Sequence, residues 1–235
     1  MASKEAMARR ALIFGATGAI GSAISDQLHR EGYQVTGIAR QVQDSTYPIL
    51  SWDPFSELPP PQLEQTFDSV IWAQGMNLND GIDTFNLAQH EQIYRANVSY
   101  ILLTLHHLLK SDRLAKPSRL CIISSIWQNI ARQNKLSYMV TKSALQGLVQ
   151  SLMIDLGQDG HLVNAVLPGA LDTQMTRNNL SSDQIKQLET MSPIRSLPEL
   201  EDVAQLVSFL CSEKNSGITG QFINADRGFS YARII

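Results

Sequence analysis

The chain has 235 residues, of which 43% are hydrophobic and 17% charged, a composition typical of a soluble globular protein. Its length suits one α/β domain with a single buried core. The net charge is −3 and no Lys/Arg cluster is present, so we expect no nucleic-acid partner. No apolar stretch is long enough for a transmembrane helix, so we expect no membrane partner.

Two cysteines, Cys121 and Cys211, lie in or at the end of apolar segments. We expect small buried hydrophobes in a reducing compartment rather than a disulfide or a nucleophile. Neither has a metal-like spacing to a histidine, so no metal site is predicted. Arg9-Arg10 precedes an apolar run, as in a twin-arginine signal, but glycines soon break that run. We therefore expect a cytoplasmic protein with a frayed terminus over residues 1–9.

Short apolar runs alternate with helical patterns along the chain. The expected strands are residues 11–15, 34–39, 47–52, 69–73, 119–124, 161–167 and 221–224. The expected helices are residues 19–31, 87–110, the segment that carries Tyr138 and Lys142, 182–190 and 201–212. This alternation predicts an α/β fold: a doubly wound parallel sheet of about seven strands with helices on both faces and right-handed crossovers. With no repeat or linker, one domain is the simplest arrangement.

A glycine-rich loop, Gly15-Ala16-Thr17-Gly18-Ala19-Ile20-Gly21, follows the first predicted strand and opens the first helix. Glycine lets the backbone approach a pyrophosphate closely, and the helix N-terminus supplies free N–H donors. The alternative is a tight turn that binds nothing. The position of the loop in the first βα turn favours nucleotide binding.

The residue that ends the second strand discriminates between dinucleotides, because an acid there binds the ribose 2′-hydroxyl and an arginine accommodates a 2′-phosphate. That strand ends in Ala39-Arg40 with no acid. The sequence therefore favours NADP(H) over NAD(H), unless Arg40 merely ends a surface strand. Asp53, after the third strand, is a candidate adenine contact or a turn residue before Pro54.

Tyr138 and Lys142 stand four residues apart in a segment with helical periodicity, and Ser125 lies upstream. Residues at this spacing share a helix face. A nearby cation favours phenolate and so lowers the pKa of a tyrosine, which makes it a usable proton donor or acceptor near neutral pH. The alternative is an ordinary solvated helix face.

Taken together, the order and spacing of these motifs resemble the short-chain dehydrogenase/reductase family over nearly the whole chain. The matching segments are residues 15–21, Asn97, residues 123–125, residues 138–142, residues 163–173, residues 218–221 and residues 224–226. The resemblance implies a Rossmann-type fold and an NAD(P)-dependent oxidoreductase acting on a small-molecule carbonyl/alcohol pair. It also implies a homodimer or homotetramer that pairs the helices carrying Asn97 and Tyr138.

Residue roles follow from the resemblance. Tyr138 would be the general acid/base and Ser125 would hydrogen-bond the substrate oxygen. Lys142 would lower the pKa of Tyr138 and hold the nicotinamide ribose, while Asn97 would support a water linking Lys142 to solvent. The residues expected to contact the cofactor are Gly15, Thr17, Gly18, Ile20, Gly21, Arg40, Asp53, Ala73, Gly75, Tyr138, Lys142, Pro168, Gly169, Leu171 and Thr173. Residues 172–198 are the expected substrate loop, with Trp127 as either a pocket wall or core.

Several positions depart from the family pattern. The Gly-x-x-Gly-x-x-Gly spacing is closer to the branch that includes nucleotide-sugar epimerases and dehydratases, although those chains are usually longer. The Asn-Asn-Ala-Gly motif after the fourth strand is replaced by Trp72-Ala73-Gln74-Gly75. Two alternatives to a carbonyl reductase therefore remain: an epimerase/dehydratase-like enzyme, and a dinucleotide-binding regulator without turnover. Retention of Ser125, Tyr138 and Lys142 argues against the regulator.

Overall fold

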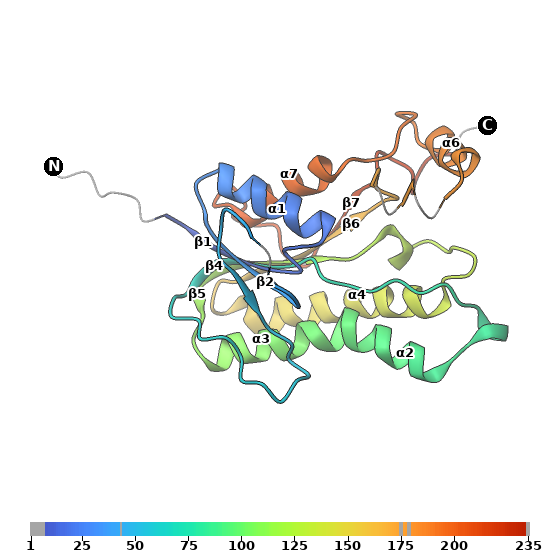
Figure 1. Cartoon of the computed structure of the whole chain (residues 1–235). Helices are drawn as coiled ribbons and strands as arrows, with labels where there is room; N and C mark the ends of the chain where they lie inside the picture. Colours follow the sequence, from blue (N-terminus) through green and yellow to red (C-terminus); the bar gives the residue numbers. More distant parts are fainter. Residues whose placement is uncertain (1–7, 43, 174–175, 178–179, 234–235) are drawn as a thin grey trace.

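The computed structural model of the chain describes residues 8–42, 44–173, 176–177 and 180–233 (Figure 1). Within these residues a seven-stranded sheet has the order β3-β2-β1-β4-β5-β6-β7, and every neighbouring pair is parallel. The strands are β1 (Arg10–Phe14), β2 (Gln34–Ala39), β3 (Ile49–Ser51), β4 (Phe67–Trp72), β5 (Leu114–Ile123), β6 (Leu162–Pro168) and β7 (Phe222–Ala225). The predicted doubly wound sheet is confirmed.

Helices cover both faces of the sheet (Figure 1). One face carries α1 (Ala19–Arg30) and α7 (Leu200–Cys211). The other carries α2 (Leu87–Tyr94), α3 (Tyr100–Lys110) and α4 (Leu136–Gly157). A further helix, α6 (Ser182–Met191), lies in the segment predicted to be the substrate loop. No helix in the described part of the chain is long and apolar enough to cross a membrane.

The strands are apolar on both sides because each face of the sheet is covered. Alternate residues of β1 show this division: Leu12 and Phe14 pack into the layer with α3 and α4, whereas Ala11 and Ile13 pack into the layer with α1 and α7. The ring of Phe14 stacks on that of Trp72 with centroids 5.6 Å apart. The sheet is therefore a rigid platform whose strand ends can hold a site.

Several element boundaries shift by one or two residues from the predictions, and three differences have a structural explanation. Strand β5 begins at Leu114 rather than at residue 119, since the strand continues through Pro117 with a register shift against β4; proline in a pattern argues against a central strand. Strand β3 is shorter than expected because it lies at the sheet edge with one partner. The predicted helix 87–110 contains a π-helical segment, Arg95–Ser99, a form often found at functional sites.

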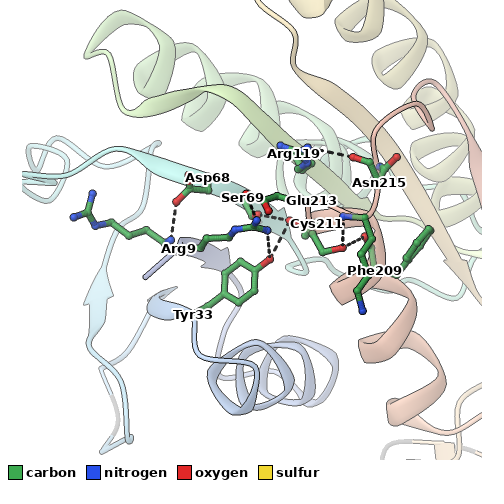
Figure 2. A network of polar contacts seen from close by, with 12 residues as sticks. Arg9, Tyr33, Asp68, Ser69, Arg119, Phe209, Cys211, Glu213 and Asn215 are labelled. Atoms are coloured by element: carbon green, nitrogen blue, oxygen red, sulfur yellow. Dashed lines mark hydrogen bonds and ion pairs between the residues drawn. The ribbon is translucent and has the colours of Figure 1, made fainter. Parts of the chain in front are cut away.

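A polar network ties the amino ends of the strands to the end of α7 (Figure 2). Arg9 forms an ion pair with Glu213 and bonds the hydroxyl of Tyr33 at 3.4 Å. The backbone carbonyl of Cys211 accepts from Tyr33 and, at 2.9 Å, from the hydroxyl of Ser69. The predicted frayed terminus is thus wrong at residue 9, which these contacts hold; residues 1–7 lie outside the described residues. Both cysteines are buried and free, as predicted.

Candidate active site

The glycine loop lies at the carboxyl end of β1, where two of its glycines admit no side chain. Gly15 has φ +77°, and a Cβ there would lie 2.6 Å from the backbone nitrogen of Gln74. A Cβ on Gly21 would lie 2.1 Å from the carbonyl oxygen of Gly15. Both distances are below any tolerated contact, so the loop, the first turn of α1 and the end of β4 are packed backbone to backbone.

The N-terminus of α1 is open to a ligand. Gly18 occupies the N-cap position without a side-chain cap, and no acidic residue stands in the first turn. Thr17 and Gly18 are exposed, while Ile20 packs against the core layer below. Uncapped N–H groups at a helix N-terminus form an anion site. The loop therefore fits the pyrophosphate of a dinucleotide.

Arg40 and Asp53 follow the ends of the neighbouring strands β2 and β3. Arg40 is exposed, and its carbonyl accepts from the hydroxyl of Ser51 at 3.3 Å. The carboxylate of Asp53 accepts from the backbone nitrogen of Phe55 at 3.0 Å, the geometry of an Asx turn. Asp53 therefore acts as a turn residue in this structure. Contacts of Arg40 or Asp53 with a cofactor stay predictions.

Ser125, Tyr138 and Lys142 come together at the carboxyl end of β5. Ser125 follows this strand and caps a 3₁₀ turn, Ile126–Gln128. Tyr138 lies in the first turn of α4 and is half-buried. One turn later, Lys142 is 5% exposed, and its Nζ donates to the carbonyl of Ile123 at 3.0 Å. That Nζ is 5.6 Å from the centroid of the Tyr138 ring, so the predicted shared face is confirmed.

Asn97 lies in the π-helical segment and joins the loop after β4 to α4. Its Oδ1 accepts from the backbone nitrogen of Met76 at 2.7 Å, and its Nδ2 donates to Oγ1 of Thr141 at 2.9 Å. A Cβ on Gly75 would lie 3.1 Å from Oδ1 of Asn97 and 3.8 Å from Nζ of Lys142. The amide therefore anchors the backbone that passes beside Lys142.

The other predicted cofactor residues flank this group. The nitrogen of Ala73 donates to the carbonyl of Phe14 at 2.9 Å, beside the glycine loop. Pro168 ends β6, and the nitrogen of Gly169 donates to Ala225 at 3.0 Å. Leu171 is buried, and the hydroxyl of Thr173 accepts from the nitrogen of Thr176. Thus the site spans the carboxyl ends of β1, β4, β5 and β6.

A small, mostly apolar cleft lies beside Ser125, and the centres of water-sized molecules fit in only about 10 Å³ of it. It is lined by Ile126, Trp127, Gly169, Ala170, Leu188, Ser192, Ser196, Leu197, Pro198, Asp226 and Phe229. Trp127 meets Phe229 edge-on, with ring centroids 6.2 Å apart. Trp127 is therefore a wall of the cleft, and several other lining residues come from the predicted substrate loop 172–198.

Burial dominates the proton affinities at the site. Burial raises the pKa of Tyr138, against the lowering effects of a hydrogen bond with Ser125 and the charge of Arg132. Burial also lowers the pKa of Lys142 to about 8. The causes that act on the pKa of Tyr138 in this structure are burial, Ser125 and Arg132. The expectation that Lys142 lowers the pKa of Tyr138 stays a prediction.

Three residues near Tyr138 were missed by sequence reasoning. Asp80 accepts a hydrogen bond from the nitrogen of Ser137 at 3.0 Å. The Nζ of Lys135 is 5.6 Å from the Tyr138 ring centroid, and Arg132 stacks over Trp127. Lys135 is the N-cap residue of α4, and its position three residues before Tyr138 is visible in the sequence. The contacts of Asp80 and Arg132 depend on the fold. Among the described residues, no cluster of metal-ligating side chains occurs.

The glycine cradle and the buried Ser–Tyr–Lys group at one edge of a parallel sheet define a class, the dinucleotide-dependent oxidoreductases. A family model described as enoyl-(acyl carrier protein) reductase matches residues 62–230. The chain belongs to the short-chain dehydrogenase/reductase family, and is an oxidoreductase of that family.

Individual relatives match over nearly their full length. The uncharacterised oxidoreductase YmfI of Bacillus subtilis is 26% identical over 244 residues, covering 95% of this chain and 99% of its own. The 3-oxoacyl-[acyl-carrier-protein] reductase FabG of Aquifex aeolicus is 28% identical over 243 residues, covering 92% and 95%. The solved gluconate 5-dehydrogenase of Burkholderia cenocepacia, in complex with NADP and tartrate, has a TM-score of 0.83 at 18% identity, with 96% of each chain covered.

Proposed function

We propose that this protein transfers a hydride between NADP(H) and a carbonyl/secondary alcohol pair, with Tyr138 as the general acid/base. One observation carries the proposal: the phenol of Tyr138, the hydroxyl of Ser125 and the ammonium of Lys142 converge beside the open glycine loop. This is the set of groups that a proton-coupled hydride transfer needs, since a donor must reach the oxygen whose carbon accepts the hydride.

The residues present fit a dinucleotide. Gly15 and Gly21 leave no space for a side chain where a pyrophosphate would approach, and the uncapped N-terminus of α1 faces the same loop. In this proposal the loop holds the pyrophosphate, Lys142 holds the nicotinamide ribose, and Pro168, Gly169, Leu171 and Thr173 border the nicotinamide. The bound cofactor supplies the hydride.

The chain's own residues then handle the substrate oxygen. Ser125 and Tyr138 hydrogen-bond it, and Tyr138 donates its proton as the carbonyl is reduced. The raised pKa of Tyr138 keeps the phenol protonated at neutral pH, so the proton is present for transfer to the substrate oxygen. Asn97 keeps the backbone of Met76 in place beside Lys142 and, in this proposal, supports the water that resupplies the proton.

The choice of NADP(H) rests on Arg40, an exposed cation directly after β2. A guanidinium there accommodates the 2′-phosphate, whereas an acid would select NAD(H). A fold of this kind holds NADP in the gluconate 5-dehydrogenase of Burkholderia cenocepacia. Asp53 would lie near the adenine, with its backbone turn already fixed by Phe55.

The alternatives are weaker. The glycine spacing favours an epimerase or dehydratase of nucleotide sugars, but the relatives reported above that carry an assigned activity are a reductase and a dehydrogenase. A regulator without turnover would have no need for the buried Ser125–Tyr138–Lys142 group. We also infer a cytoplasmic location from the two free buried cysteines, since such thiols suit a reducing compartment.

The expected homodimer or homotetramer has a surface that suits it. Leu102 and Leu103 of α3 and Ile154 of α4 are large apolar side chains that the single chain leaves exposed. Leu102 and Leu103 are adjacent on α3, and adjacent exposed apolar side chains suit an interface. Small-angle scattering should give the mass of a dimer or tetramer, and a monomeric mass would exclude the proposed assembly.

The function is tested by Tyr138→Phe, with Tyr94→Phe on α2 as the matched control. NADPH binding, followed by fluorescence, should persist in both variants. Turnover in a screen of carbonyl substrates should be lost only in Tyr138→Phe, because the aromatic ring remains but the proton donor is gone. Unchanged turnover in Tyr138→Phe would refute the assigned mechanism.

A further inference from the structure

Two cations besides Lys142 lie near Tyr138, and both come from the segment between Ser125 and α4. The Nζ of Lys135 is 5.6 Å from the centroid of the Tyr138 ring. The guanidinium of Arg132 is 5.1 Å from the centroid of the Trp127 ring. The charge of Arg132 is felt by both Lys135 and Tyr138. These two side chains therefore make the surroundings of the reacting phenol positive.

Within the described residues, no ion pair includes Arg132 or Lys135. Lys135 is 5% exposed and bonds a neutral partner, Oδ1 of Asn77, at 2.6 Å. The charge of Asp80 acts on Lys135, but its carboxylate accepts hydrogen bonds from Ser137 and forms no ion pair with the lysine. The two cations thus outnumber this one acid, and a buried charge that is incompletely balanced favours binding of an anion.

The cofactor does not need these cations. Its pyrophosphate is assigned to the loop 15–21 and its 2′-phosphate to Arg40. Arg132, in contrast, lies against Trp127, which forms a wall of the apolar cleft together with Gly169 and Phe229. The unpaired charge therefore lies on the substrate side of Tyr138.

We propose that the carbonyl substrate carries an oxyanion, a carboxylate or a phosphate ester, which Arg132 and Lys135 bind while its carbonyl reaches Tyr138 and Ser125. This inference rests on the proposed function. An arginine binds an oxyanion with two parallel N–H donors and a lysine binds it as a point charge. The apolar cleft beside Trp127 takes the uncharged part of the substrate.

The test compares charged and neutral members of matched pairs: acetoacetate with ethyl acetoacetate, and dihydroxyacetone phosphate with dihydroxyacetone. Arg132→Gln and Lys135→Gln should each lower the charged-to-neutral ratio of kcat/KM by about tenfold or more, the loss expected for one charge-assisted hydrogen bond. Any effect on the acidity of Tyr138 is common to both members and cancels in the ratio. The pair that responds identifies the oxyanion as carboxylate or phosphate.

Controls separate this inference from the proposed function. Lys214→Gln replaces an exposed lysine after α7 and should leave the ratio unchanged. Arg132→Lys keeps the positive charge and should lower the ratio less than Arg132→Gln does. Calorimetry of acetoacetate and of dihydroxyacetone phosphate against the Tyr138→Phe protein with NADPH measures anion binding without turnover. If neutral ketones are reduced but neither anion binds, or if both pairs keep their ratios in the two glutamine variants, the anion site is disproved. If the wild type reduces none of the ketones, that result would instead count against the proposed function.

Discussion

The carboxylate of Asp80 accepts hydrogen bonds from both the backbone nitrogen and the hydroxyl of Ser137, the residue before Tyr138. Helix α4 has no side-chain cap of its own at Lys135. A residue 57 positions earlier in the chain therefore satisfies its first turn. This contact ties the loop after β4 to the turn that carries the phenol, so the position of Tyr138 depends on Asp80.

Asp80→Ala should reduce both stability and turnover. Loss of a helix cap costs about 1–2 kcal/mol, and the fully buried hydroxyl of Ser137 would lose an acceptor. Urea unfolding at pH 7 measures the stability. The kcat for a ketone that the enzyme reduces reports whether Tyr138 is still in its catalytic position. Asp83→Ala, which removes an exposed carboxylate from the same loop, is the control. Equal effects of the two substitutions would contradict a capping role for Asp80.

Burial of Lys142 should make stability depend on pH. Its pKa is about 8 in the folded protein against 10.5 when unfolded, so the unfolded chain binds more protons between these values. Lys142 therefore makes the free energy of unfolding rise as the pH increases from 8 toward 10.5. Lys142→Met removes this pH dependence. The difference in unfolding free energy between wild type and variant should therefore change by about 2–3 kcal/mol between pH 7 and pH 10.

The measurement for Lys142 is a series of guanidinium unfolding curves for both proteins at matched pH values. The comparison with the variant isolates Lys142 from Lys135, whose pKa is also lowered to about 8. A difference that stays constant across the range would mean that Lys142 keeps its normal proton affinity when buried.

Gly21→Ala should disrupt dinucleotide binding. The new Cβ would lie 2.1 Å from the carbonyl oxygen of Gly15, which forces the cradle and the first turn of α1 apart. A displacement of about 1 Å can cost on the order of a hundredfold in a positioned site, so NADPH affinity measured by fluorescence should fall steeply. Gly217→Ala, where no atom lies within 4 Å of the added Cβ, should bind NADPH normally. Normal binding by Gly21→Ala would exclude the loop as the pyrophosphate site.

Arg40→Asp should reverse the cofactor preference. The substitution replaces a partner of the 2′-phosphate with an acceptor for the 2′-hydroxyl, so NADPH affinity should fall by roughly tenfold or more while NADH affinity rises. Dissociation constants for both dinucleotides are measured by fluorescence quenching. Lys214→Asp makes the same change of charge after α7, at a distance from the site, and should alter neither value. A retained NADPH affinity in Arg40→Asp would show that another group selects the cofactor.

Much of the fold could be read from local pattern. The apolar runs of β1, β2 and β6 are each buried on both faces, so their sequence signal is strong. The start of β5 was missed because Pro117 interrupts the pattern, and only pairing with β4 accommodates it. The π-helical turn at Asn97 has no local signature either, since Asn97 is held by Met76 and Thr141 from other elements.

By itself, the sequence determined the family, the glycine loop and the spacing of Tyr138 and Lys142, because these depend on residue type and short-range separation. Only the tertiary structure decided the electrostatics around Tyr138. Burial raises its pKa and lowers that of Lys142, and the degree of burial depends on how the sheet, α4 and the loop after β4 pack. The same packing brings Arg132, Lys135 and Asp80 to the phenol, which no local pattern can specify.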